Sequence, residues 1–134
     1  RWRGLKVTGT GEVENAIIES TYLGREDHGI FTFFLHLKMN GSGQGFGGFC
    51  LDEPIKDSKG KFLRRQGCAF GLEALMKVLE VVGAEKWEAL PGKHVRLDHD
   101  WSKAYRIGHI IEDKWLDLEE LATRFQGASQ GDVT

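Results

Sequence analysis

The sequence predicts an α+β domain: an OB-like, five-stranded, partly open β-barrel with one central helix and a short C-terminal helix. The main observation is the order of the segments, because three strand-like runs precede one amphipathic helix and two short runs follow it. A second observation is that no catalytic motif competes with this order. The expected strands are residues 13–23, 30–39, 44–51, 93–98 and 105–111, and the expected helices are residues 70–82 and 117–125.

The first two strands are expected to form a hairpin. Residues 13–23 are rich in β-branched and aromatic side chains, and two glycines, Gly24 and Gly29, bracket four polar residues that make the turn. In residues 30–39 the apolar side chains alternate with Phe34, His36 and Lys38, a period of two that buries one face of the strand. We therefore expect Phe34, His36 and Lys38 to lie on the opposite face.

The third strand is unusually rich in glycine. Gly45, Gly47 and Gly48 surround Phe46 and Phe49. Glycine weakens a strand, so its presence predicts a bulge, a bend of the barrel, or the close approach of another backbone or a ligand. The following residues 52–65 carry many charges and are expected to form an exposed loop.

The helix over residues 70–82 is expected to bury the stripe of large apolar side chains along one of its faces. Gly83 is expected to end this helix. The fourth and fifth strands follow the turn at Pro91 and Gly92, and Asp117 with Glu120 is typical of a helix start. We expect one globular domain over residues 1–125 and a disordered tail over 126–134. The stripe consists of Leu72, Leu75, Met76, Leu79 and Val82.

Composition limits the functional classes. The chain has 134 residues, of which 40% are apolar, and a formal net charge of −2. It carries no apolar run long enough to cross a bilayer, so we expect no membrane partner. The start lacks the apolar core of a signal peptide, and Cys50 and Cys68 are too few for a disulfide framework, which together indicate a reducing cytosol. The acidic balance argues against strong non-specific binding to duplex DNA.

Two clusters suggest acid/base or metal chemistry. His28 follows two carboxylates in the first turn, and His99 lies between Asp98 and Asp100. Turn chemistry explains both clusters more simply, because Asp residues and glycine are common turn formers and no further ligands occur at metal spacing. We therefore expect no catalytic residue, no metal and no cofactor. Of the three functions considered, an enzyme is the least favoured.

The signal for nucleic-acid binding is the interleaving of aromatic and basic residues. Single strands are held by aromatic platforms beside a positive groove. Most phenylalanines of so small a domain belong in its core, so the candidates are the side chains of the exposed face and the basic residues of the following loop. The predicted nucleic-acid-binding residues are Phe34, His36, Lys38, Lys61, Arg64 and Arg65.

Four segments carry specific motifs, namely residues 22–32 (YLGREDHGIFT), 43–48 (GQGFGG), 79–93 (LEVVGAEKWEALPGK) and 107–115 (IGHIIEDKW). These segments resemble a family of small phage and prophage proteins that carry no assigned activity. The resemblance spans most of residues 13–118 and implies a phage origin, and hence the cytoplasm of a bacterial host, but no catalytic residues. The helix followed by Val-Gly-x-x-x-Trp-x-x-Leu-Pro-Gly-Lys is also similar to phage single-strand-binding accessory proteins.

A phage origin suggests a second function, an anti-CRISPR-like counter-defence inhibitor that binds a host defence protein or sequesters a nucleotide signal. An acidic face that mimics nucleic acid would suit this role, although acids at a helix start also stabilise the helix. Open strand edges leave a homodimer as a further alternative. The residues of the acidic patch are Glu112, Asp113, Asp117, Glu119 and Glu120.

Overall fold

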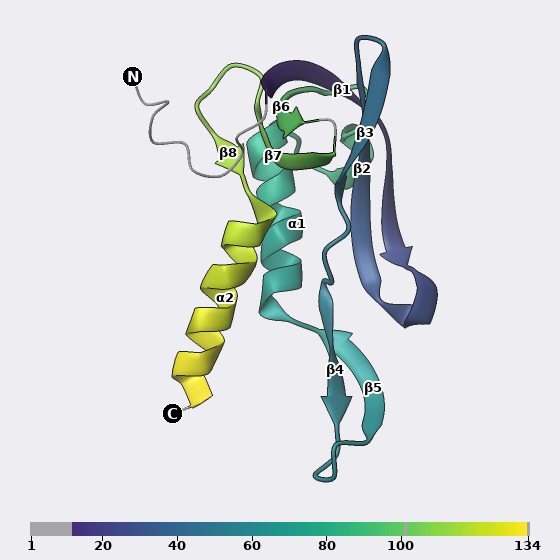
Figure 1. Cartoon of the computed structure of the whole chain (residues 1–134), viewed down its shortest axis with the longest axis vertical. Helices are drawn as coiled ribbons and strands as arrows, with labels where there is room; N and C mark the ends of the chain where they lie inside the picture. Colours follow the sequence, from purple (N-terminus) through teal and green to yellow (C-terminus); the bar gives the residue numbers. More distant parts are fainter. Residues whose placement is uncertain (1–11, 101, 134) are drawn as a thin grey trace.

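The structure is a computed structural model that describes the backbone of residues 12–100 and 102–133 and the side chains up to Gln126. The part of the expected domain in residues 1–11 lies outside the described residues. The chain is an α+β protein, as the sequence predicts (Figure 1). Its elements are β1 (Glu12–Arg25), β2 (Phe31–Met39), β3 (Ser42–Gly47), β4 (Asp52–Lys56), β5 (Phe62–Gly67), α1 (Ala69–Val82), β6 (His94–Asp100), β7 (Lys103–His109), β8 (Trp115–Leu116) and α2 (Leu118–Val133), with short 3-10 turns at Asp27–Gly29 and Trp87–Ala89.

Six strands form one antiparallel sheet in the order β3-β2-β1-β6-β7-β8. The long strand β1 lies in its middle and pairs with β2 and with β6. The two-residue strand β8 extends the sheet beyond β7, so the sheet has six strands rather than the expected five. Gln44 of β3 donates a hydrogen bond to the carbonyl of Asp100 (3.2 Å). No ladder joins β3 to β7 within the described residues, so the sheet does not close into a barrel.

The period of two in β2 predicts its two faces correctly. Phe33, Leu35 and Leu37 are at most 2% exposed and pack in the core, whereas His36 and Lys38 are exposed. The core also takes side chains from β6, β7 and α1. Burying each large apolar side chain stabilises the fold by about 1.5–3 kcal/mol, so this one cluster accounts for the cohesion of sheet and helix.

Helix α1 begins one residue before the predicted start and ends where predicted, but the predicted buried stripe is only partly correct. Val82 is buried and Leu75 and Leu79 pack against the core, whereas Leu72 and Met76 are 64% and 56% exposed. The other buried residues of the helix are Gly71, Ala74, Val78 and Val81. The cause is close packing, because a Cβ at Gly71 would lie 2.0 Å from the carbonyl oxygen of Leu51. At the other end Gly83 adopts the left-handed conformation (φ 87°) and donates to the carbonyl of Leu79, which confirms the predicted helix end.

The loop expected over residues 52–65 is a hairpin. Among the described strands, β4 and β5 pair only with each other, and they project away from the six-stranded sheet (Figure 1). Their mostly exposed side chains explain why the prediction failed. A ribbon whose side chains are mostly exposed on both faces shows no hydrophobic period.

Helix α2 lies against α1 and continues to Val133, beyond the expected end at Phe125. The predicted helix start is confirmed, because Asp117 Oδ1 accepts a hydrogen bond from the backbone N–H of Glu120 (3.1 Å). The Phe70 ring of α1 packs between the rings of Phe49 and Phe125, and the distances between ring centroids are 6.3 Å and 6.1 Å. These contacts fix α2 to the rest of the domain.

Candidate nucleic-acid interface

The outer face of β2 carries the row Phe34, His36 and Lys38. The rings of Phe34 and His36 stack at a centroid distance of 6.2 Å and an angle of 21°. Both residues point away from the core because they alternate with its buried side chains. The sequence therefore predicted correctly that these three residues share the outer face.

Strand β3 places a glycine beside each residue of this row. Phe34 pairs with Gly47, His36 with Gly45 and Lys38 with Gly43. Because partners in a ladder share a face, the outer face of β3 has no side chains at these three positions. A Cβ at Gly45 would meet nothing within 4 Å, so open space lies over the strand there. We call the outer face of β2 and β3, with its row and its three glycines, the platform.

Glycines also let the aromatic rings lie close to the backbone. A Cβ at Gly48 would lie 2.9 Å from the Phe34 ring, and one at Gly24 would lie 3.0 Å from the Tyr22 hydroxyl. Tyr22 pairs with Phe34 across β1 and β2 and is 39% exposed, so its ring belongs to the same face. Its hydroxyl donates to the carbonyl of Arg25. The rings are thus held in place before any ligand binds.

The positive charge of the platform continues onto β6. Ile17 of β1 pairs with Lys38 on one side and with His94 on the other, so these three side chains form one row across the sheet. Lys38 and His94 are exposed. Next to them Arg96 is held by hydrogen bonds to the carbonyls of His109 (2.7 Å) and Glu112 (2.8 Å). Sequence reasoning did not include Tyr22, His94 or the three glycines in the site, although the period of two in β6 indicates that His94 faces away from the core.

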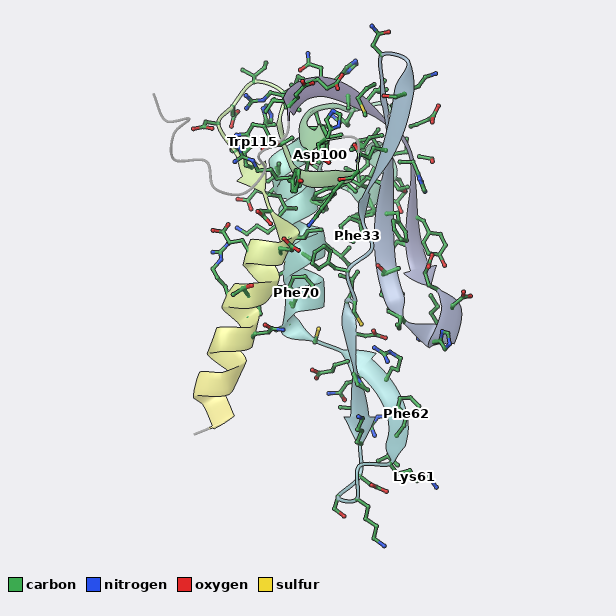
Figure 2. All side chains as sticks on the ribbon, viewed as in Figure 1. Phe33, Lys61, Phe62, Phe70, Asp100 and Trp115 are labelled. Atoms are coloured by element: carbon green, nitrogen blue, oxygen red, sulfur yellow. The ribbon has the colours of Figure 1, made fainter. Side chains whose placement is uncertain are left out.

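The three predicted basic residues of the charged segment lie on the hairpin and not on the platform. Lys61 lies near the far end of the hairpin (Figure 2), and Arg64 is exposed on β5. Arg65 is engaged inside the chain, because its guanidinium forms two 2.9 Å hydrogen bonds with the Asp52 carboxylate. This pairing lowers the pKa of Asp52 below its ordinary value. The predicted set is therefore divided between two places.

Most of the acidic patch takes part in local contacts. Asp117 caps α2, Glu119 forms an ion pair with Lys103 (3.3 Å), and Glu112 forms one with Lys114 (3.0 Å), which lowers the pKa of Glu112. The side chain of Asp113 accepts a hydrogen bond from the Trp115 indole (3.2 Å). The structure places these residues near one another in the β7–β8 connection and the first turn of α2.

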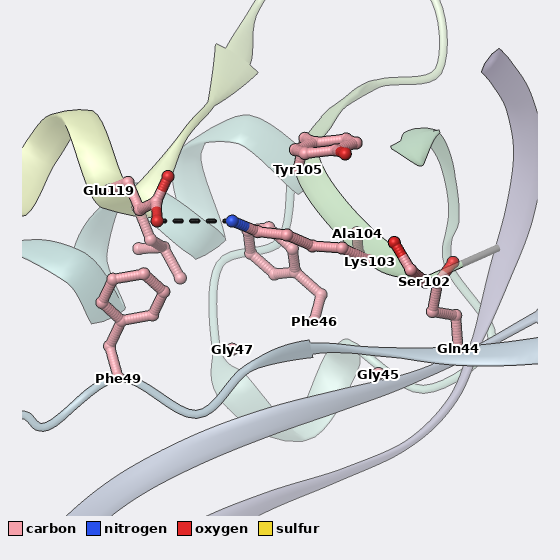
Figure 3. A pocket seen from close by; sticks show the side chains of 11 residues that line it. Gln44, Gly45, Phe46, Gly47, Phe49, Ser102, Lys103, Ala104, Tyr105 and Glu119 are labelled. Carbon is pink, nitrogen blue, oxygen red and sulfur yellow. Dashed lines mark hydrogen bonds and ion pairs between the residues drawn. The ribbon is translucent and has the colours of Figure 1, made fainter. Parts of the chain in front are cut away.

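A pocket of about 380 Å³ lies between β3, the β6–β7 turn and the start of α2 (Figure 3). Phe46 and Phe49 line its apolar side, and the ion pair between Lys103 and Glu119 crosses it. Beside it Asp100 accepts hydrogen bonds from the Tyr105 hydroxyl and from Ser102, which lower the pKa of Asp100 to about 2. The carboxylate thus holds the β6–β7 turn together as an anion.

The two histidine clusters take part in turns and strand pairing. His28 lies in the 3-10 turn with a positive φ of 68°, and His99 Nε2 lies 2.6 Å from Glu14 Oε2. Among the described side chains, those of residues 12–100 and 102–126, no group of three from His, Cys, Asp or Glu is arranged to hold a metal ion.

Comparisons with known proteins find no match: no family model fits the chain, and neither the curated proteins nor the solved structures contain a similar one. Within its described part, the chain has no helix that is both long and apolar enough to span a membrane.

Proposed function

We propose that this chain is a non-enzymatic binding protein that holds single-stranded nucleic acid on the platform. One observation carries the proposal, namely that the row Phe34, His36 and Lys38 faces three glycines across the β2–β3 ladder. Stacked rings offer a surface for unpaired bases, and the open space over Gly45 leaves room for a sugar or base beside them. Lys38 supplies positive charge for the phosphates.

The topology supports this choice of face. In OB-type domains the face of the second and third strands binds oligonucleotides, and here these strands are β2 and β3. We propose that the curled sheet is an OB-like, partly open barrel in which β3 and β7 form the open seam. A phage accessory factor in the cytoplasm of a bacterial host, acting in phage DNA metabolism, would have use for such a surface.

Fluorescence anisotropy with a labelled single-stranded oligonucleotide tests the proposal. Phe34→Ala should weaken binding about tenfold or more, because base stacking on a ring contributes about 1–3 kcal/mol. Gly45→Val should also weaken binding, since it fills the open space over β3 without a clash. The control is Gly67→Val, which adds the same side chain where a Cβ meets nothing within 4 Å, on the hairpin. Equal affinities for all four proteins, or no binding at low salt, would exclude the platform.

The alternative function is a counter-defence inhibitor that contacts a host protein. The specific observation in its favour is the exposed pair Leu72 and Met76 on α1, since large exposed apolar groups are typical of protein interfaces. Salt separates the two functions, because nucleic-acid binding weakens steeply as salt rises. An inhibitor would bind one host protein and would not bind oligonucleotides.

A further inference from the structure

The β4–β5 hairpin is a positively charged arm. Its residues 52–67 include five basic and three acidic side chains. Four of the basic side chains are exposed and form no ion pair within the described part of the chain. They are Lys56, Lys59, Lys61 and Arg64.

The three acids of the arm are used within the arm. Asp52 pairs with Arg65, and Glu53 accepts a hydrogen bond from Gln66 (3.3 Å). Asp57 accepts hydrogen bonds from the backbone N–H groups of Lys59 and Lys61, each at 2.9 Å. Among the described residues, only Asp52 of these acids has a cationic partner. With five bases against three acids the arm keeps a net positive charge, which fits a polyanion.

An exposed apolar pair lies among these cations. Phe62 and Leu63 are 54% and 52% exposed. The ladder shifts register beside them, so that Phe62 pairs with Lys56 and Leu63 has no partner on β4. Such a bulge twists a strand and redirects its side chains. Figure 2 shows Phe62 beside Lys61 near the far end of the arm.

The end of the arm is a defined turn. The backbone N–H of Asp57 donates to the carbonyl of Lys61 (2.9 Å), and that of Gly60 donates to the carbonyl of Asp57 (2.9 Å). With the two bonds to the Asp57 carboxylate, four hydrogen bonds hold the turn. The lysines beside it are therefore presented on a shaped backbone, which lowers the entropic cost of binding.

We propose that this arm binds the duplex side of a junction between double-stranded and single-stranded nucleic acid, while the platform holds the single strand. The inference rests on the proposed function and names its substrate class. Two-stranded ribbons fit the grooves of duplexes, and apolar side chains can act as wedges between bases. Inside a duplex a wedge must unstack two base pairs, at a cost of a few kcal/mol. At a junction the last base pair is already exposed, so Phe62 and Leu63 can stack on it without that cost.

The experiment compares three labelled DNA probes on the intact chain: a single strand, a blunt duplex, and a fork that joins the two. The expected order of affinity is fork, then single strand, then duplex. The test variant is Phe62→Ser with Leu63→Ser, which should lose about tenfold in fork affinity and keep the affinity for the single strand. The matched control is Leu72→Ser with Met76→Ser, which removes two comparably exposed apolar side chains from α1.

A second variant removes charge. Lys56→Gln with Lys59→Gln and Lys61→Gln should lower the salt dependence of fork binding by up to about 0.9 in log–log slope for each phosphate that the arm no longer neutralises. Lys86→Gln, an exposed lysine after α1, is the charge control.

The outcomes separate the two proposals. If the hairpin variants keep the parent's ratio of fork to single-strand affinity, the arm does not bind the duplex and the inference is wrong. If Phe34→Ala changes nothing but the hairpin variants lose fork binding, the platform is wrong and the arm remains. If Phe62→Ser with Leu63→Ser instead halves the molecular mass by sedimentation and leaves fork affinity unchanged, the arm is a contact between two copies and the inference is overturned.

Discussion

The six-stranded sheet and the β4–β5 hairpin differ in what their side chains contact. In β2 of the sheet every second residue from Phe33 to Met39 is buried, whereas in the whole hairpin only Asp52 is buried. An isolated two-stranded ribbon has little stability of its own. The hairpin is tied to the sheet chiefly at its root, where the backbone N–H of Leu51 donates to the carbonyl of Phe31 (2.8 Å).

The difference teaches where to look for function. Packing constrains the choice of residues on the inner face of the sheet, so a phenylalanine there, such as Phe33, is explained by the core. Packing does not explain Phe62 or Leu63, because both are more than half exposed. Substitutions of side chains buried in the sheet should therefore change the free energy of unfolding, and substitutions of exposed hairpin side chains should change binding.

The largest contrast should come from two phenylalanines. Phe33 is fully buried and meets Trp87 edge to face, at a ring distance of 5.7 Å. Phe33→Ala should lower the free energy of unfolding by about 3–5 kcal/mol, since it leaves a cavity in the core. Phe62→Ala should change it by less than about 0.5 kcal/mol. Urea denaturation measures both, and similar losses would mean that Phe62 is covered in solution.

Two glycines provide the next contrast. Gly71→Ala places a methyl group against the Leu51 carbonyl and should cost about 1–3 kcal/mol, because α1 must move away from that strand connection. Gly67→Ala adds the same group where nothing lies within 4 Å and should be close to neutral. Thermal unfolding of the two variants tests whether α1 really packs through its small residues. A neutral Gly71→Ala would contradict that packing.

Local patterns in the sequence predicted the elements that have a buried face. The alternation in β2 indicated Phe34, His36 and Lys38 as the outer row, and Gly83 marked the end of α1. The buried face of α1 was missed in part because large side chains were expected inside. The spacing of Gly71, Ala74, Val78 and Val81 was the available signal, since small residues at helical spacing allow close approach.

The site was harder to predict because it depends on placement. That three glycines of β3 lie opposite the β2 row follows from the register of the ladder, which depends on the β2–β3 turn. The position of Lys61 and Arg64 depends on the direction in which the hairpin leaves the domain. No local sequence pattern predicts the direction in which the hairpin leaves the domain. Lys61 and Arg64 could therefore not be assigned to the platform or to a separate arm from the sequence.

The smallest of the three expected losses of stability concerns two adjacent arginines of β5, Arg64 and Arg65. Their substitutions should have clearly different effects. Arg65 forms the paired hydrogen bonds with the largely buried Asp52, whereas Arg64 is exposed and forms no ion pair with a described residue. Arg65→Gln should lower the free energy of unfolding by about 1–2 kcal/mol at neutral pH, because it leaves the Asp52 carboxylate without its charged partner. Arg64→Gln should leave stability unchanged and weaken fork binding.

The pH dependence identifies the cause of the Arg65 effect. Arg65 lowers the folded-state pKa of Asp52 below the ordinary 3.8, so the pair stabilises the fold above that pH. This stabilisation is lost as the pH falls through the lowered pKa and the carboxylate takes up a proton. The difference in unfolding free energy between the parent and Arg65→Gln should therefore be largest at neutral pH and shrink below about pH 3.8. A difference that stays constant down to about pH 2 would mean that Arg65 acts through packing of its side-chain stem instead.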